Sequence, residues 1–368
     1  MKKILIVTHW FYPRNVPRAF RAWELVRELR RKNVKVDIVI GDYKIFVKDE
    51  DFNEDQFKNI EVNTSKYKNI SNNRIFSAFK NMLMYFIGDR YFFKSGVFLF
   101  KNIDMIKYDS IISIGLPFYV NFVSALKISK SKSINCVTIG EWSDPFYGIE
   151  DNRVAVYFKS IQKMICNRFD YTIVPTVKAV DYFKEYVDIG KIKVIPQGFN
   201  FSNIGLAKYK ENDVIKFAYA GIFYLDIRNP EKFLQFLSTL EFDFVFVIYT
   251  ITHGPVYTEV LEKYKKVLKN KLEIHDLIPR EKVIKELSKM DFLINIENNS
   301  QNQIPSKLID YAITKRPIFS FTPNNVPEKE FLKFMERDYS NSLSINLDDY
   351  NIDKVSEQFM ELFESRNN

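Results

Sequence analysis

Short apolar runs alternate with amphipathic segments from the first residues of the chain. Residues 2–7 end in four apolar residues, residues 18–32 have a polar and an apolar face, and residues 34–40 are again mostly apolar. The spacing of five apolar residues in the middle segment fits one face of a helix: Phe20, Trp23, Leu25, Val26 and Leu29. The order strand, helix, strand predicts the start of a parallel, doubly wound α/β sheet.

The alternation continues to about residue 200. Further strands are predicted at 108–114, 134–139, 171–174 and 192–195, with a helix at 177–186. Residues 43–73 are polar and weakly periodic, which predicts an irregular connection. Residues 74–100 are aromatic and basic, which is typical either of amphipathic helices on a membrane or of helices that pack on the sheet.

A second α/β pattern follows residues 201–213, which have the composition of a linker. It predicts strands at 217–220, 244–249, 272–275, 292–296 and 317–321, and helices at 230–240, 257–268, 281–289 and 306–314. We therefore expect an N-terminal domain over 1–200, a second domain over 214–345, and a C-terminal helix in 346–368 that packs back on the first domain. Two such domains would face a central cleft, lined by the loops at the carboxyl ends of the strands.

Composition narrows the class of protein. Apolar residues make up 46% and charged residues 27%, as in a globular protein with a core. The apolar run at the N-terminus is too short for a signal peptide and no run is long enough to span a bilayer, so we expect a cytoplasmic protein. Cys136 and Cys166 lie in no C-x-x-C pair, which predicts buried thiols and no metal site.

The net charge of +8 is unevenly distributed, because the whole basic excess lies in residues 1–200. An anionic membrane surface, an anionic acceptor or nucleic acid could each account for this excess, and so could a lysine-rich proteome. No nucleic-acid-binding motif accompanies the charge, so we expect no nucleic-acid partner. No G-x-G-x-x-G follows the first strand, which disfavours a nicotinamide enzyme.

The first candidate site is the start of the predicted helix at 306–314. Pro305 suits the first turn of a helix, and the free amides of Ser306 and Lys307 with the helix dipole favour an anion such as a diphosphate. Asp310 lies one turn further on the same face, where a carboxylate could accept hydrogen bonds from ribose hydroxyls. An ordinary capped helix is the alternative.

Two more candidates follow predicted strands. Gly221 lets the backbone approach a ligand closely, and Arg228 precedes a helix where it could grip phosphate oxygens. Glu141 and Asp144, three residues apart beside Trp142, suit sugar recognition or proton transfer. A turn capped by Asp144 is the alternative for the last group.

The order of these motifs resembles that of family-4-like bacterial glycosyltransferases, which have the GT-B fold. The resemblance rests on K-I-L-I-V-T-H-W-F-Y-P, Y-D-S-I-I-S-I-G-L-P-F, G-E-W-S-D-P-F, D-Y-T-I-V-P-T with K-V-I-P-Q-G-F, F-A-Y-A-G-I-F-Y-L-D-I-R-N-P, and P-S-K-L-I-D-Y-A-I-T-K-R-P-I. It covers some 310 residues of the chain.

The resemblance implies roles for individual residues. It places Arg228 and Lys307 on the donor diphosphate, Asp310 on the ribose, and Glu141 and Asp144 on the acceptor side. The implied catalytic residues are Glu141, Asp144, Arg228 and Lys307; the implied donor-binding residues are Gly221, Tyr224, His275, Leu277, Asn302, Pro305, Ser306 and Asp310; and the implied acceptor-side loop contains Tyr12, Arg14 and Arg18. The chain departs from the family at Asn302, which replaces the first Glu of the paired acidic motif, and at residues 14–17, which replace a Gly-Gly loop.

The implied function is a retaining glycosyltransferase that needs no metal or cofactor. It would move a sugar from a nucleoside-diphosphate sugar, with a UDP-sugar as the first expectation and a GDP-sugar as the second, to a saccharide or lipid-linked acceptor of bacterial lipopolysaccharide, O-antigen or capsule. The basic half would place it peripherally on the anionic inner face of the cell membrane. A nucleotide-sugar epimerase of the same fold and a catalytically silent sugar-binding subunit are the alternatives, the second because of Asn302.

Overall fold

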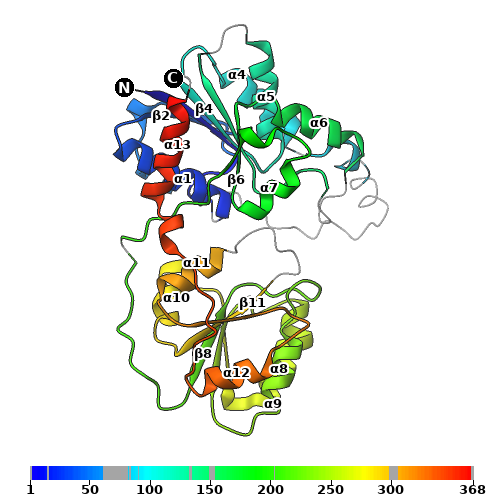
Figure 1. Cartoon of the computed structure of the whole chain (residues 1–368), viewed down its shortest axis with the longest axis vertical. Helices are drawn as coiled ribbons and strands as arrows, with labels where there is room; N and C mark the ends of the chain where they lie inside the picture. The colour runs from blue at the N-terminus through cyan, green and yellow to red at the C-terminus, as the bar shows by residue number, and fades with distance from the viewer. Residues whose placement is uncertain are drawn as a thin grey trace. The chain divides into compact units, whose positions relative to one another are not determined.

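The computed structural model describes residues 2–14, 16–60, 82, 84–89, 91–131, 135–148, 154–202, 204–297 and 306–365. They form two compact units, described separately below (Figure 1). The first unit comprises Met1–Asn200 together with Asp349–Asn368, and the second comprises Phe201–Asp348. The C-terminal residues therefore return to the unit in which the chain begins.

The first unit is built on a seven-stranded sheet in the described residues, with the strand order β3-β2-β1-β4-β5-β6-β7. Its strands are β1 (Lys3–Thr8), β2 (Lys35–Ile40), β3 (Ile45–Val47), β4 (Ser110–Ile114), β5 (Val137–Glu141), β6 (Tyr171–Val174) and β7 (Ile192–Val194). All neighbours pair in parallel except β3, which runs antiparallel to β2. The chain leaves β1 toward β2 and returns to β4 on the other side, so the strand order reverses between β1 and β4.

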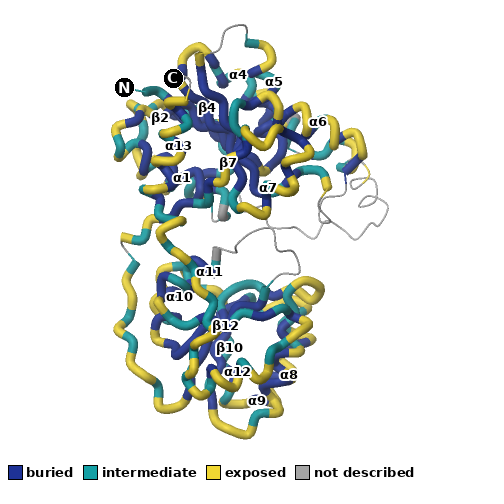
Figure 2. Tube along the Cα trace, in the orientation of Figure 1, coloured by how far each residue is buried: buried dark blue, intermediate teal, exposed yellow. Residues whose placement is uncertain are grey.

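Helices cover both faces of this sheet. They are α1 (Pro17–Arg31), α2 (Asp55–Lys58), α4 (Val97–Asn102), α5 (Tyr119–Lys130), α6 (Tyr157–Cys166), α7 (Val177–Phe183) and α13 (Ile352–Glu364), with a π-helical turn at Phe92–Gly96. Along β1, Ile4 and Ile6 enter the core on one face while Leu5 and Val7 enter the core on the other. Because both faces are covered, the central strands β1 and β4 are buried along almost their whole length, as Figure 2 shows.

The last helix, α13, belongs to the core of the first unit. Val355 and Phe359 join the same apolar cluster as Trp23 and Val26 of α1. The contact is closed at its edge by ion pairs from Arg31 and Lys32 to Asp353, at 2.9 and 3.0 Å, and from Lys32 to Glu357 at 3.1 Å.

The second unit repeats the plan on a smaller scale. Its described strands are β8 (Lys216–Ala220), β9 (Val245–Tyr249), β10 (Leu272–His275), β11 (Phe292–Ile296) and β12 (Ile318–Phe321), in the order β10-β9-β8-β11-β12. All are parallel, and the order reverses between β8 and β11. Its helices are α8 (Glu231–Leu237), α9 (Glu262–Leu268), which continues a π-helical turn at Tyr257–Leu261, α10 (Arg280–Leu287), α11 (Ser306–Ile313) and α12 (Glu328–Met335).

The two faces of this second sheet have different cores. One core is unusually aromatic, with Phe217 stacked between Phe246 and Phe292 at centroid distances of 5.0 and 4.8 Å. It includes Leu261, from the turn before α9. The other core contains Leu308 and Tyr311 of α11. A ligand at the carboxyl ends of these strands can therefore meet α9 on one side of the sheet and α11 on the other.

The predicted doubly wound α/β class is confirmed, and the predicted strands lie within a few residues of those found. The irregular connection expected for residues 43–73 is wrong in part, because β3 and α2 lie there; a three-residue strand is too short to show a period of two. Of the stretch 74–100, residues 74–81, 83 and 90 lie outside the described residues. Among the described helices, none has the length and apolarity to cross a bilayer.

Candidate functional site

The candidate site of the second unit lies at the carboxyl ends of β8 and β11, where the strand order reverses. This is the position at which open parallel sheets bind ligands. After β8 the chain makes a tight hairpin, in which Tyr224 and Arg228 exchange backbone hydrogen bonds of 3.2 Å. Gly221 begins this loop with φ at +143°, and a Cβ there would lie 3.2 Å from the Tyr219 hydroxyl, so glycine suits both the backbone and the space.

Lys307 lies in the first turn of α11, and its side chain points back to the end of β11. Its ammonium donates a 3.0 Å hydrogen bond to the carbonyl oxygen of Ile296 and lies 4.7 Å from the ring centroid of Tyr219. Burial of the ammonium lowers the pKa of Lys307 well below its usual value, and the nearby Arg228 lowers it further, while Glu297 opposes the shift.

Arg228 is the second cation at this point. Its Nη1 donates a 3.2 Å hydrogen bond to the carbonyl oxygen of Ile222, within the hairpin. Arg228 also hydrogen-bonds to the side chain of Tyr219, over whose ring Lys307 lies, and its charge lowers the pKa of Lys307; the two residues are hereafter the cationic pair. Two mutually repelling cations at a strand-order reversal would be stabilised by an anion with more than one negative charge.

Asp310 lies one turn further along α11 and pairs with Arg280, the first residue of α10. The guanidinium donates from Nε at 2.9 Å and from Nη2 at 2.5 Å, both to Oδ1. Burial raises the pKa of Asp310, and the charge and hydrogen bonds of Arg280 act against that rise. The carboxylate is therefore held in a fixed orientation by a residue that the sequence analysis did not single out.

The remaining donor-side predictions fall at different places. His275 ends β10 and stacks on Tyr249 with centroids 5.2 Å apart, and Leu277 is about half exposed (48%) in the following loop. Tyr224 is exposed at the hairpin. Asn302 and Pro305 lie outside the described residues, and Ser306 is described only as the first residue of α11.

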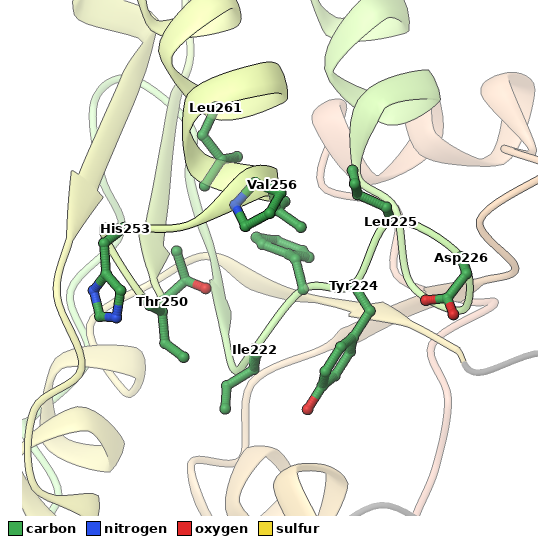
Figure 3. Close-up of a pocket in the computed structure, with 11 residues that line it drawn as sticks. Ile222, Tyr224, Leu225, Asp226, Thr250, His253, Val256 and Leu261 are labelled. Carbon is green, nitrogen blue, oxygen red and sulfur yellow. The ribbon is translucent and has the colours of Figure 1, made fainter. Parts of the chain in front are cut away.

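A pocket of about 510 Å³ is lined in part by the same hairpin (Figure 3). It lies between the loop after β8 and the loop after β9, within the second unit. Its lining is largely apolar: Ile222, Phe223, Tyr224, Leu225, Asp226, Thr250, Ile251, His253, Pro255, Val256 and Leu261. This volume is in the ordinary range for small-molecule sites.

In the first unit, Glu141 ends β5 with no exposed surface and is held by two arginines of α1. Arg18 donates to both carboxylate oxygens at 2.8 and 2.9 Å, and Arg21 Nε lies 3.1 Å from Oε1. Burial lowers the pKa of Arg21 to about 10, the Glu141 carboxylate opposes this, and Arg18 adds to it. The carboxylate predicted for sugar recognition or proton transfer is thus engaged in a buried ion-pair cluster.

The other acceptor-side predictions do not converge on Glu141. Arg14 pairs with Asp42 at 2.6 Å, and Tyr12 stacks on Trp23 with centroids 4.6 Å apart. Asp144 is partly buried, three residues beyond the end of β5. Of the predicted loop residues, Arg18 contacts a predicted catalytic residue, Glu141.

His9, which follows β1, is a buried polar residue that the sequence analysis did not single out. It is 1% exposed, and its Nδ1 lies 2.7 Å from the hydroxyl of Tyr119. The feature of the sequence that could have indicated His9 is its place at the end of the first strand, beside the strand-order reversal. Among the described residues, no three His, Cys, Asp or Glu side chains gather in a way that could hold a metal ion.

Two Rossmann-like units with parallel sheets define the fold of the GT-B glycosyltransferases, and comparison with solved structures agrees. The chain is similar to TarM (TM-score 0.63, 12% identity, 99% of each chain). It is also similar to a glycosyltransferase from Rickettsia africae (TM-score 0.62, 13% identity, 100% of this chain and 98% of that one). A third similar structure is HepE from Anabaena in complex with UDP-glucose (TM-score 0.58, 9% identity, 99% of this chain and 100% of that one). No family model and no curated protein matches the sequence.

Proposed function

We propose that this protein is a glycosyltransferase that moves a sugar from a nucleoside-diphosphate sugar to an acceptor hydroxyl. The observation that carries the proposal is the cationic pair, in which Arg228 and Lys307 both contact the side chain of Tyr219 at the strand-order reversal of the second unit. In such a reaction negative charge grows on the leaving diphosphate as the glycosidic bond breaks. Arg228 and a protonated Lys307 would stabilise that growing charge more than they stabilise the bound substrate, which is the main electrostatic task of the catalyst.

Asp310 is the proposed ribose ligand. Arg280 binds Oδ1, and we assign Oδ2 to the two vicinal hydroxyls of the ribose. The loop from His275 to Ile278, between β10 and α10, is proposed to contact the base through backbone atoms, with Leu277 against the face of the base. A UDP-sugar is the first expectation for the donor and a GDP-sugar the second, because HepE, of similar fold, binds UDP-glucose.

On this proposal, residues 214–345 form the donor domain and residues 1–200 the acceptor domain. Glu141 and Asp144 belong to the acceptor side, together with Tyr12, Arg14 and Arg18. Since Glu141 is enclosed by Arg18 and Arg21, we propose that it positions Arg18, which keeps some exposure, for an acceptor. The resemblance to family-4-like enzymes supports retention of anomeric configuration.

We propose a cytoplasmic enzyme that acts on a lipid-linked acceptor of surface polysaccharide and docks on the anionic inner membrane face. An exposed apolar patch in the first unit supports this: Tyr85, Phe86, Val156 and Tyr157. The segment with Tyr85 and Phe86 is joined to the segment with Val156 and Tyr157 by two hydrogen bonds. One, of 3.0 Å, runs from the Ala155 amide to the Tyr85 carbonyl, and the other from the Tyr157 hydroxyl to the Phe86 carbonyl. Lys159 and Lys163 of α6 follow directly, so apolar and basic groups lie together.

A thermal-shift screen of the whole chain against UDP-, GDP-, dTDP- and CMP-sugars tests the donor, because a ligand that binds the folded state stabilises it by mass action. We expect a rise in Tm with one nucleotide class, UDP first. Incubation of that donor with membrane lipid should then yield labelled glycolipid. Conversion of the donor to a different sugar nucleotide without an acceptor would favour the epimerase, and no conversion with intact binding would favour the silent subunit.

A further inference from the structure

A chain of polar side chains lies on the face of the second sheet that α11 covers. Asn295 of β11 donates a 2.6 Å hydrogen bond to the hydroxyl of Ser320 in β12, and that hydroxyl donates one of 2.8 Å to Oε1 of Glu297. Leu293, two residues before Asn295, packs in the same core as Leu308 of α11, and alternate residues of a strand point to the same face. Three polar residues therefore replace apolar ones beneath the start of α11.

The effect of this chain is to orient a carboxylate. Asn295 is 1% exposed, in a strand that is otherwise apolar. A buried amide in such a strand costs free energy unless it is hydrogen-bonded. Here the hydrogen bonds run outward from Asn295 through Ser320 to Glu297, which is partly buried just beyond the end of β11.

The Glu297 carboxylate lies beside the cationic pair. Lys307 donates its 3.0 Å hydrogen bond to the carbonyl oxygen of Ile296, the residue that precedes Glu297. The charge of Glu297 raises the pKa of Lys307, against the effects of burial and of Arg228. A diphosphate at the cationic pair would therefore have this carboxylate as a neighbour. Because both are negative, the carboxylate is suited to a neutral hydrogen-bond donor attached to the diphosphate and not to the phosphates themselves.

The strand order places Glu297 and Asp310 on opposite sides of the cationic pair. Asp310 is paired with Arg280 of α10, the helix that crosses from β10 to β11. Glu297 is hydrogen-bonded instead to β12, the edge strand on the far side of β11. The cationic pair, at the ends of β8 and β11, lies between them in the order β10-β9-β8-β11-β12. Ribose and sugar are attached at opposite ends of the diphosphate, so a ribose at Asp310 directs the sugar toward Glu297.

We propose that the carboxylate of Glu297 binds a hydroxyl group of the donor sugar, and that Ser320 and Asn295 are positioning residues that orient it. This inference rests on the proposed function and names a residue that selects its donor sugar. Ser320 holds Oε1, and Oε2 is assigned to the sugar hydroxyl. An ionised carboxylate only accepts hydrogen bonds, so the site favours a sugar with a hydroxyl at this position over its deoxy analogue.

Calorimetric titration of the whole chain with matched ligands tests this: UDP with UDP-glucose and UDP-galactose, GDP with GDP-mannose, and dTDP with dTDP-glucose. The quantity compared is the affinity for the sugar nucleotide divided by that for the free diphosphate, which reports on the sugar. Glu297→Gln should lower this ratio about tenfold for the sugar nucleotide that the wild type binds most tightly, because a charge-assisted hydrogen bond is lost. Glu336→Gln, at an exposed position after α12, is the matched control and should keep the ratio.

Two further variants separate a contact with the sugar from the charge of Glu297, and cover the case in which Glu297→Gln fails to fold. Glu297→Asp keeps the charge beside Lys307 but shortens the side chain, so it should lower the ratio and leave the affinity for the free diphosphate unchanged. Ser320→Ala should also lower the ratio, because the carboxylate is retained but no longer oriented. Ser320→Thr, which keeps the hydroxyl, should restore it.

A wild-type ratio in folded Glu297→Asp would mean that only the charge matters and would overturn the inference. If the wild type binds a nucleoside diphosphate but Glu297→Gln keeps the ratio, the inference is overturned and the proposed function stands. If the wild type binds none of these nucleotides or sugar nucleotides, both are overturned.

Discussion

Arg280 donates two hydrogen bonds to Oδ1 of Asp310, across the contact between α10 and α11. Burial raises the pKa of this carboxyl group and so favours its protonated form. The guanidinium lowers the pKa and so favours the carboxylate, which it also holds in place. Arg280 is thus a positioning residue: on our account it keeps Asp310 ionised and oriented for the ribose.

Nucleotide affinity should depend on pH through Asp310. Only the ionised carboxylate accepts from both ribose hydroxyls, so affinity for UDP-glucose should fall as the pH is lowered through the pKa of Asp310, which lies above that of an ordinary Asp. Arg280→Gln removes the group that lowers this pKa and should move the midpoint to higher pH, whereas Arg280→Lys should leave it nearer the wild-type value. Calorimetry over a pH series measures the midpoints. Identical curves for wild type, Arg280→Gln and Asp310→Asn would remove Asp310 from the nucleotide site.

Binding of the donor should be accompanied by proton uptake at alkaline pH. Burial and Arg228 lower the pKa of Lys307, so part of the free protein carries a neutral amine there, and a bound diphosphate favours the charged form. Calorimetry in two buffers of different ionisation enthalpy measures the uptake. Lys307→Arg should bind without it, because a guanidinium stays charged. Equal uptake by wild type and this variant would assign the proton to another group.

The sequence predicts the strands better than the contacts between their ends. β1, β8, β9 and β11 are covered on both faces, and so their apolar runs are evident along the chain. Arg280 and Asp310 are 30 residues apart, and their ion pair depends on how α10 packs on α11, which no local pattern records. For the same reason the sequence around Glu141 predicts sugar or proton chemistry. Its closest partners, Arg18 and Arg21, belong to α1, which lies far earlier in the chain.

Glu141 should be a large contributor to the stability of the first unit. Glu141→Gln removes the buried charge that holds Arg21, which is buried, and Arg18, which is partly buried, and breaking a buried ion pair of this kind costs about 3 kcal/mol or more of the free energy of unfolding. Urea-induced unfolding followed by circular dichroism measures the change. Glu185→Gln is the control, because its pair with Lys159 at 2.9 Å is exposed and should be worth at most about 1 kcal/mol. Equal small losses in both variants would mean that the cluster is not a structural anchor.

Membrane binding should require the patch around Phe86 and Val156. We expect the protein to co-sediment with vesicles containing anionic lipid at low salt, and to be released as salt screens the attraction. The double variant Phe86→Ser, Val156→Ser should remain in the supernatant, because it loses the apolar contact. Ile106→Ser, at an exposed apolar position outside the patch, is the control. Equal recovery of wild type in the supernatant with neutral and anionic vesicles would leave a soluble enzyme.

The central claim is that the cationic pair binds the donor diphosphate, and titration of UDP into the whole chain tests it most directly. The account predicts one binding site, with affinity lowered about tenfold or more in both Arg228→Ala and Lys307→Ala, since each loses a charge-assisted hydrogen bond. Lys282→Ala, at an exposed position of α10, should bind as wild type does. Wild-type affinity in folded Arg228→Ala and Lys307→Ala would contradict the account.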